Sequence, residues 1–211
     1  MLNLVCGQKI KLNDVLQEQS SFYIQIQYQA AFDLDIASFG LDPQYRLSDE
    51  RYMTFYNQSE TPCHAVRLIE NQNKCNRFLV DLVKLPASIQ HLVLTAAIDG
   101  QNVMSQLQQA TIQILNLQLQ PIAELKLDGS IFDQERATML IEVYRKEGIW
   151  RLAAVGQGFN AGLAALIQHF GGEVAEEPIS QKTTSIAPQS NIDLKKKLSF
   201  TKAEKTGNAS I

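Results

Sequence analysis

Two aspartates, Asp33 and Asp35, stand at the start of residues 34–41, a segment that otherwise has the composition of a β-strand. Aspartate is rare in strands because its short side chain favours hydrogen bonds to the local backbone in turns. Side chains two residues apart on a strand point to the same face, so these two negative charges should lie close together and repel each other. Two interpretations follow: the segment is a solvated turn, or a positive ion lies between the carboxylates.

Two more oxygen-bearing side chains could join this aspartate pair. A hairpin between residues 34–41 and 51–57 would bring Asn57 to the end of the sheet where the pair lies. Asp99 directly follows the apolar segment 91–98. It would reach the same end only if that segment runs in the right direction, which the sequence leaves open.

Carboxylate and amide oxygens are hard ligands, and Ca²⁺ takes about 6–8 oxygens at roughly 2.3–2.6 Å. Backbone carbonyls and water would have to complete such a site. The spacing is not that of an EF-hand loop, because the required glycine and glutamate are missing. On spacing alone, ordinary turn residues explain these side chains better than a calcium site does. The predicted metal ligands are Asp33, Asp35, Asn57 and Asp99.

The sequence offers little for catalysis. Cys63 and His64 are adjacent, and adjacent residues on a strand point to opposite faces, so the imidazole is badly placed to activate the thiol. Asp33 and Asp35 could act as an acid/base pair only with one raised pKa and a substrate cleft. The glycines of residues 156–162 lack a P-loop lysine and are interpreted as a strand-to-helix turn. We therefore expect no enzymatic activity and no catalytic residue.

The elements that must position these residues are mostly short strands. Residues 21–30 alternate strictly between apolar and polar side chains, the pattern of a half-buried strand. One helix is predicted over residues 160–170, with Asn160 as its N-cap. Many short strands and one late helix indicate a mainly β fold, an antiparallel β-sandwich of two sheets with one or two short helices. Further strands are predicted at 34–41, 51–57, 65–70, 77–85, 91–98, 110–117, 122–127, 138–145 and 149–156.

The bulk composition excludes several classes of protein. A net charge of −3 over 211 residues argues against a nucleic-acid binder. No window approaches the roughly 20 apolar residues of a membrane-spanning helix. Three cysteines without metal-site spacing and no recognisable signal peptide predict a cytoplasmic protein with free thiols.

The chain divides into a domain of residues 1–172 and a tail of residues 173–211. Apolar periodicity vanishes after residue 172, which predicts a disordered polar linker. From residue 193 onward, five lysines against two acids give +3, so the remainder of the chain carries −6. This basic segment is either simply solvated or weakly attracted to anionic lipid, at about 1 kcal/mol per lysine near the surface.

Five segments, in order and spanning about residues 3–172, carry a resemblance to a known family. They are "CGQKIKL", "FDLDIASFGLD", "LSDERYMTFYNQ", "VDLVKLPASIQHLVLTAAIDG" and "IEVYRKEGIWRLAAVGQGFNAGLAALIQHFGG". Together they resemble the tellurium-resistance TerD family of bacterial stress proteins. The resemblance implies a β-sandwich that binds calcium through acidic loops at one end, with no established catalytic activity. It also implies a role in resistance to tellurite, phage and other stresses near the inner face of the membrane.

The predicted metal ligands fall on acidic or amide positions of the family's motifs, but residues 59–82 depart from its pattern. Typical members carry a glycine-rich loop there that ends in consecutive acids. Here Glu60 and Glu70 are isolated, and Lys74 and Arg77 stand where carboxylates would be expected. The resemblance therefore implies one calcium site and does not support a second.

The shorter loop is closer to the TerA- and TerF-like branch of the family. In some proteins of that branch, a von Willebrand A-type domain follows the TerD-like domain. Candidate partners are therefore other tellurium-resistance or stress proteins and a protein with a von Willebrand A-type domain. Two hypotheses remain: a calcium-binding scaffold, or a protein-interaction module of a stress or phage-defence complex whose metal site has degenerated.

Overall fold

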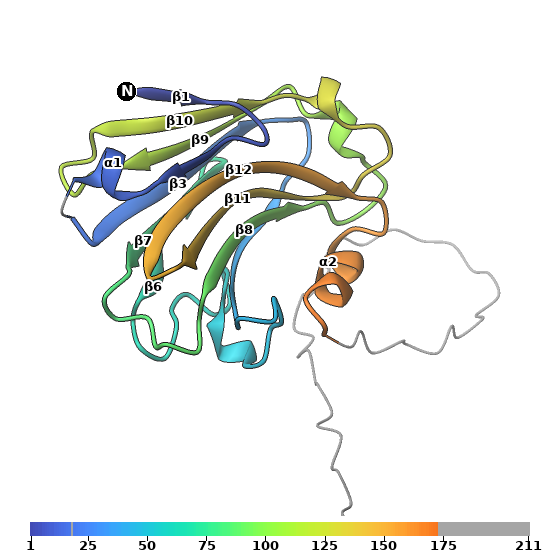
Figure 1. Cartoon of the computed structure of the whole chain (residues 1–211). Helices are drawn as coiled ribbons and strands as arrows, with labels where there is room; N and C mark the ends of the chain where they lie inside the picture. Colours follow the sequence, from blue (N-terminus) through green and yellow to red (C-terminus); the bar gives the residue numbers. More distant parts are fainter. Residues whose placement is uncertain (18, 173–211) are drawn as a thin grey trace, which may run out of the picture.

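The computed structural model describes residues 1–17 and 19–172 and shows two β-sheets packed as layers (Figure 1). Each sheet has six strands, and the predicted mainly β sandwich with few helices is confirmed. The first sheet has the order β1 (Leu2–Leu4), β10 (Pro121–Leu127), β9 (Gln109–Leu115), β3 (Ser21–Gln29), β7 (Cys75–Asp81), β6 (Val66–Gln72). The second has the order β2 (Lys9–Lys11), β12 (Ile149–Phe159), β11 (Ala137–Lys146), β8 (His91–Ala97), β4 (Asp35–Leu41), β5 (Met53–Thr54).

The helices are short. They are α1 (Asn13–Leu16), α2 (Leu163–His169) and the 3₁₀ turns η1 (Glu50–Tyr52), η2 (Met104–Gln106) and η3 (Gly129–Ile131). None of the helices among residues 1–17 and 19–172 is long and apolar enough to cross a membrane. The three cysteines of the chain are free thiols, as predicted. The predicted polar linker and basic tail, residues 173–211, lie outside the described residues.

The main core lies between the two sheets and follows from the period-two pattern. On β3, Phe22, Ile24 and Ile26 point inward and are fully buried, while Tyr23 and Gln25 between them face outward. Leu92 and Leu94 of β8 supply the opposite layer. Burying an apolar side chain of this size contributes about 1.5–3 kcal/mol relative to leaving it exposed, so this layer stabilises the sandwich.

A second apolar cluster covers the outer face of the second sheet. Phe39 of β4 and Val93 of β8 are fully buried there beneath Leu166 and Phe170 of the α2 region. The rings of Phe39 and Phe170 lie 5.0 Å apart. Strands β4 and β8 are therefore buried on both faces, which explains why their sequences are almost continuously apolar.

The structure corrects the predicted start of the late helix. Strand β12 continues to Phe159, the chain turns, and α2 begins only at Leu163. Its N-cap is Gly162, with φ +63° and no side-chain hydrogen bond, so the prediction that Asn160 caps the helix is wrong. A positive φ suits glycine because it has no Cβ.

The strand predicted over residues 51–57 is also too long. Only Met53–Thr54 pairs with β4, because η1 occupies the preceding residues, with the Asp49 carboxylate accepting a hydrogen bond from the Arg51 backbone. The first eleven residues, for which no strand was predicted, contain β1 and β2. β1 pairs in parallel with β10 of the first sheet, whereas β2 pairs with β12 of the second.

Candidate functional site

The strand register brings three of the predicted ligands to one end of the sandwich. β4 and β8 are antiparallel, and Asp35 lies opposite Ala97. Extending this register by two residues sets Asp33 opposite Asp99, beyond the paired strands. The direction of β8, which the sequence left open, is the one that the predicted cluster requires.

The electrostatics of Asp35 reflect this gathering of charge. Partial desolvation of its carboxyl raises its pKa most, and the negative charges of Asp99 and then Asp33 raise it further. All three residues are exposed at the surface. The ionised form of Asp35 is therefore disfavoured where it stands, and a nearby cation would relieve the repulsion.

Asn57 lies in a turn rather than on a strand. β5 ends at Thr54, and Phe55 and Gln58 exchange backbone hydrogen bonds of 2.9 and 3.0 Å around the exposed Asn57. Had the strand continued, its register with β4 would have set Asn57 opposite Asp35. Its role as a ligand stays a prediction.

The loop between β3 and β4, which carries Asp33, is held by two side chains. The Leu34 amide donates a 2.9 Å hydrogen bond to the hydroxyl of Tyr28. The Lys74 ammonium donates to the carbonyl of Ala30 and, at 3.2 Å, to that of Phe32. The loop backbone therefore already presents two oxygens to a cationic group.

Lys74 also approaches the acidic cluster, with 4.0 Å between its Nζ and Oδ1 of Asp33. Sequence reasoning noticed this lysine only as a departure from a family pattern and missed its contacts. The turn that carries Lys74 could have indicated its position: Asn73 and Lys74 form the two-residue turn between β6 and β7. Because β7 is antiparallel to β3, this turn lies beside the end of β3.

The oxygen ligands at this end are of the type that Ca²⁺ binds, but their side chains do not converge on one point. Carboxylates and backbone carbonyls are the ligands that this ion prefers. However, within residues 1–17 and 19–172, no three His, Cys, Asp or Glu side chains form a group that could hold a metal ion. Asp33, Asp35 and Asp99 would be the residues to hold one, and their side chains would have to converge on it.

The side chains of the adjacent Cys63 and His64 are not hydrogen-bonded to each other. The imidazole Nδ1 of His64 is 2.9 Å from Oε2 of Glu60, whereas the Cys63 thiol lies 3.6 Å from the hydroxyl of Thr61. The two side chains are thus engaged with different neighbours.

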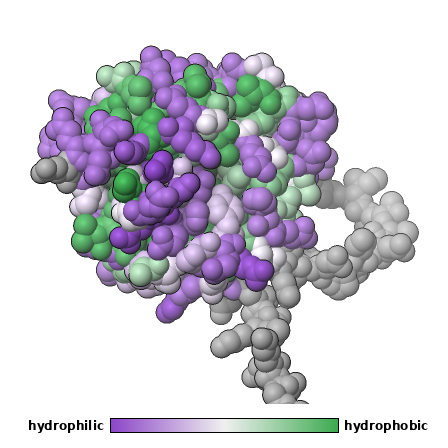
Figure 2. Space-filling view, viewed as in Figure 1, coloured by the Kyte–Doolittle hydropathy of each residue, from purple (hydrophilic) through white to green (hydrophobic). Residues whose placement is uncertain are grey.

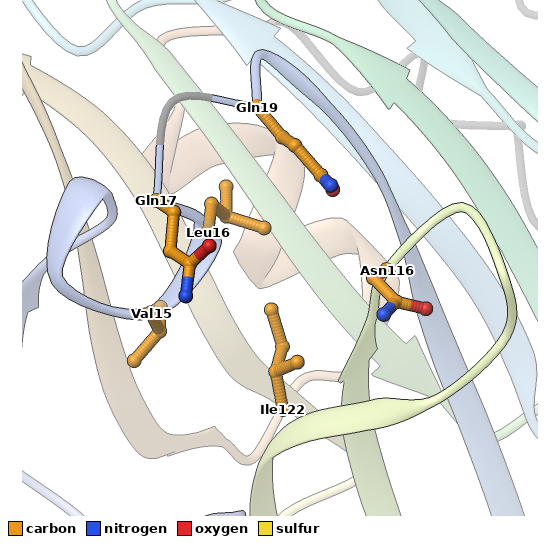
Figure 3. A pocket seen from close by; sticks show the side chains of 6 residues that line it. All are labelled: Val15, Leu16, Gln17, Gln19, Asn116 and Ile122. Atoms are coloured by element: carbon orange, nitrogen blue, oxygen red, sulfur yellow. The ribbon is translucent and has the colours of Figure 1, made fainter.

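A small hollow of about 110 Å³ lies at the other end of the first sheet (Figure 3). It lies near the start of β3 and the end of β9, away from the acidic end. None of the residues that line it carries a charge or a nucleophile. They are Val15, Leu16, Gln17, Gln19, Asn116 and Ile122.

The surface shows no dominant apolar area on the face drawn in Figure 2, where hydrophilic and apolar residues are interspersed. A protein partner that bound this face would therefore meet a mixed surface, as most non-obligate partners do.

Comparison with known proteins agrees with the fold and with the motifs. The family model described as TerD domain matches residues 1–170. A tellurium resistance protein TerA from an Alcaligenes species is 35% identical over 128 residues, which are 60% of this chain and 36% of that protein. The match thus spans little more than a third of the length of that relative.

Two further comparisons cover a larger share of the matched protein. An uncharacterized protein, YceE, of Bacillus subtilis is 31% identical over 154 residues, 68% of this chain and 80% of that protein. Among solved structures, a Streptomyces coelicolor homologue of telluride resistance protein (TerD) superposes with a TM-score of 0.55 at 13% identity. That likeness covers 70% of this chain and 95% of the other, and it concerns the fold.

Proposed function

Since this chain belongs to the TerD domain family, we propose that it is a non-enzymatic, calcium-binding stress-response protein associated with tellurite resistance. The observation that carries the proposal is the gathering of Asp33, Asp35 and Asp99 at one end, where partial desolvation and then charge repulsion raise the pKa of Asp35. Asn57 is the fourth proposed ligand, from the neighbouring turn.

The proposed role of the ion is structural. A divalent cation would neutralise the carboxylates and fix the β3–β4 loop and the end of β8 relative to each other. The ordered end would then present a binding surface to a protein partner. We propose another tellurium-resistance or stress protein, or one with a von Willebrand A-type domain, in the cytoplasm near the inner face of the membrane.

Calcium titration of the full chain, freed of metal with a chelator, tests this proposal. Isothermal titration should show binding at one site, and Asp35→Asn should weaken it strongly. Calcium at 100 times its Kd should stabilise the wild type by about 2.7 kcal/mol through mass action, visible as a higher Tm. Asp14→Asn is the matched control because it removes an exposed carboxylate from α1, away from the acidic end. Binding heats that are the same in Asp35→Asn would remove the assigned site.

A second candidate function is a protein-interaction module with a degenerate metal site. The observation that favours it is Lys74, whose ammonium contacts the loop carbonyls of Ala30 and Phe32. Here capture of a partner should be the same with calcium and with a chelator. The proposed contact element, the basic segment with Lys195, lies outside the described residues; replacing its three consecutive lysines by glutamine should abolish capture.

A further inference from the structure

Lys74 is fixed in position by its own backbone. Asn73 and Lys74 both have left-handed backbone angles, φ +52° and +57°, as the two central residues of a tight hairpin turn do. The carbonyl of Lys74 accepts a 3.1 Å hydrogen bond from the amide of Tyr28, on the neighbouring strand β3. The side chain therefore starts from a rigid point beside the β3–β4 loop.

The ammonium group of Lys74 lies among oxygens and an aromatic face. It donates hydrogen bonds to the carbonyls of Ala30 and Phe32 and lies 4.0 Å from the Asp33 carboxylate. It also lies 5.7 Å from the ring centroid of Tyr28, within the range of a cation–π contact. An ammonium has three donors and no acceptor, so each of these neighbours suits its charge.

We propose that Lys74 is the built-in cation of the β3–β4 loop. Its ammonium binds the carbonyls of Ala30 and Phe32, so the loop keeps its shape without a metal. A divalent ion that binds Asp33, Asp35 and Asp99 must bind against this charge or displace it. The competition rests on the proposed calcium site, whereas the loop-holding role does not.

The physical basis is the similarity between what the ammonium contacts and what a hard cation binds. Ca²⁺ takes carboxylate and backbone carbonyl oxygens, and Lys74 engages both kinds. Two positive charges near one carboxylate repel each other, which lowers the affinity for the second. The four-carbon stem of lysine is flexible, and the Lys74 side chain is 35% exposed, so the ammonium can swing into solvent. Lys74 thus sets the calcium concentration at which the acidic end responds.

Lys74→Met tests the proposal, because it keeps the apolar stem and removes the charge. In the full chain, isothermal titration with calcium chloride should give a Kd about tenfold lower than that of the wild type, a change typical for one charge near a partly exposed site. Lys74→Arg keeps the charge and should keep the weaker affinity.

Lys84→Met is the matched control. Lys74 precedes β7 and Lys84 follows it, so the control removes the same charge at the other end of the same strand. Lys84 also forms one ion pair, 3.2 Å from Asp81, and contacts no predicted ligand. The calcium affinity of Lys84→Met should equal that of the wild type.

Amide hydrogen exchange measures the loop-holding role without calcium. In chelator, the Leu34 amide should be protected in the wild type and exchange about tenfold faster in Lys74→Met, because that variant loses both hydrogen bonds from the ammonium to the loop. Lys84→Met should exchange like the wild type. A Leu34 amide that is unprotected in chelator-treated wild type would overturn the proposal without any variant.

The outcomes separate this inference from the proposed function. If the wild type binds calcium and Lys74→Met binds it no more tightly, the competition is wrong and the calcium site stands. If neither protein binds calcium but Leu34 loses protection in Lys74→Met, the calcium site is wrong and the built-in cation stands. Identical affinity and exchange in Lys74→Met and Lys84→Met would overturn the inference entirely.

Discussion

At the residue scale, Asp35 combines its proposed role in binding with a stability penalty. Its pKa is raised in the folded protein, so its contribution to stability is most favourable below the unfolded pKa and is lost as pH rises through the folded pKa. At neutral pH without metal, the ionised carboxylate therefore destabilises the fold. Only a bound cation would make the ionised Asp35 carboxylate stabilise the fold.

Asp35→Asn should consequently have opposite effects in the two metal states. In chelator at pH 7, we expect it to raise the free energy of unfolding slightly, within the roughly 1 kcal/mol usual for exposed charges. In saturating calcium, it should unfold at a lower temperature than the wild type. Thermal unfolding with and without calcium checks both signs, and a loss of stability in chelator would contradict the repulsion.

Asp42 shows the reverse behaviour. Burial raises its pKa, but hydrogen bonds from the Ser48 hydroxyl and the Arg46 and Gln44 amides outweigh this, and the net pKa is lowered. Its stability contribution is therefore present above the unfolded pKa and is lost as pH falls through the folded pKa. We expect Asp42→Ala to cost about 1 kcal/mol at pH 7, less than the roughly 1.5–3 kcal/mol usual for hydrogen bonds to charged groups, because these hydrogen bonds are exposed. Urea unfolding at pH 7 and at pH 3 should show this difference shrink at the lower pH.

The sequence allowed part of this residue-scale description to be predicted. Asp33, Asp35 and Asp99 could each be placed at the end of a strand because each borders a short apolar pattern typical of a buried strand. The direction of the strand before Asp99, which decides whether the three meet, stayed open. The contact of Lys74 with Phe32 could not be predicted, because a pattern of apolar and polar residues does not show where the end of a long flexible side chain lies.

At the element scale, a polar row crosses the outer face of the first sheet. Arg77 of β7 donates to Oε1 of Gln25 on β3 at 2.8 and 2.6 Å and pairs with Glu70 of β6 at 2.9 Å. Gln25 donates to Gln113 of β9 at 3.4 Å, and Gln113 to Glu124 of β10 at 2.8 Å. Five neighbouring strands are thus tied side chain to side chain in one register, which would be lost if a strand slipped by one residue.

Gln25→Ala should interrupt this row at its centre. It leaves the partly buried Arg77 guanidinium with Glu70 as its remaining side-chain partner in the row, and we expect a loss of about 1–2 kcal/mol. Gln27→Ala, on the same strand and face but exposed, should change stability by less than about 0.5 kcal/mol. Equal effects of the two substitutions on urea unfolding would mean that the row adds nothing to the sheet.

The strands themselves were largely predictable, and the exceptions have physical causes. β3, β8 and β11 have long regular patterns and were placed within one or two residues. β5 was overestimated because aromatic residues around Tyr56 suit a strand as well as a turn. The predicted start of α2 was too early because the N-cap has a positive φ, which suits the glycine at position 162 better than an asparagine.

At the scale of the whole molecule, the buried ring of Phe170 is the largest side chain that attaches the α2 region to the second sheet. Phe170 is fully buried against Phe39 and against Tyr45, at 5.0 and 5.8 Å between ring centroids, and its carbonyl accepts a 2.9 Å hydrogen bond from the Leu47 amide. The outer cluster of the second sheet depends on this contact, whereas the core between the sheets does not include it.

Phe170→Ala should therefore cost about 3–5 kcal/mol, the range for emptying a buried aromatic position. The sandwich should remain folded, with faster hydrogen exchange confined to α2 and the loop it covers. Leu163→Ala, in the same helix but 38% exposed, is the control and should have a much smaller effect. Collapse of protection throughout both sheets in Phe170→Ala would show that the two clusters form a single cooperative unit.

The distance in sequence between β1 and β2 and the strands with which they pair has a consequence for folding kinetics. These neighbouring strands lie in different sheets, and their partners follow more than a hundred residues later: Leu2 pairs with Ala123, and Lys11 with Arg151. Contacts so distant in sequence form slowly, because a long stretch of chain must be closed first. During synthesis, β1 can pair only after β10 has emerged, and β2 only after β12 has emerged, so the edges of the sheets that these two strands occupy are completed late.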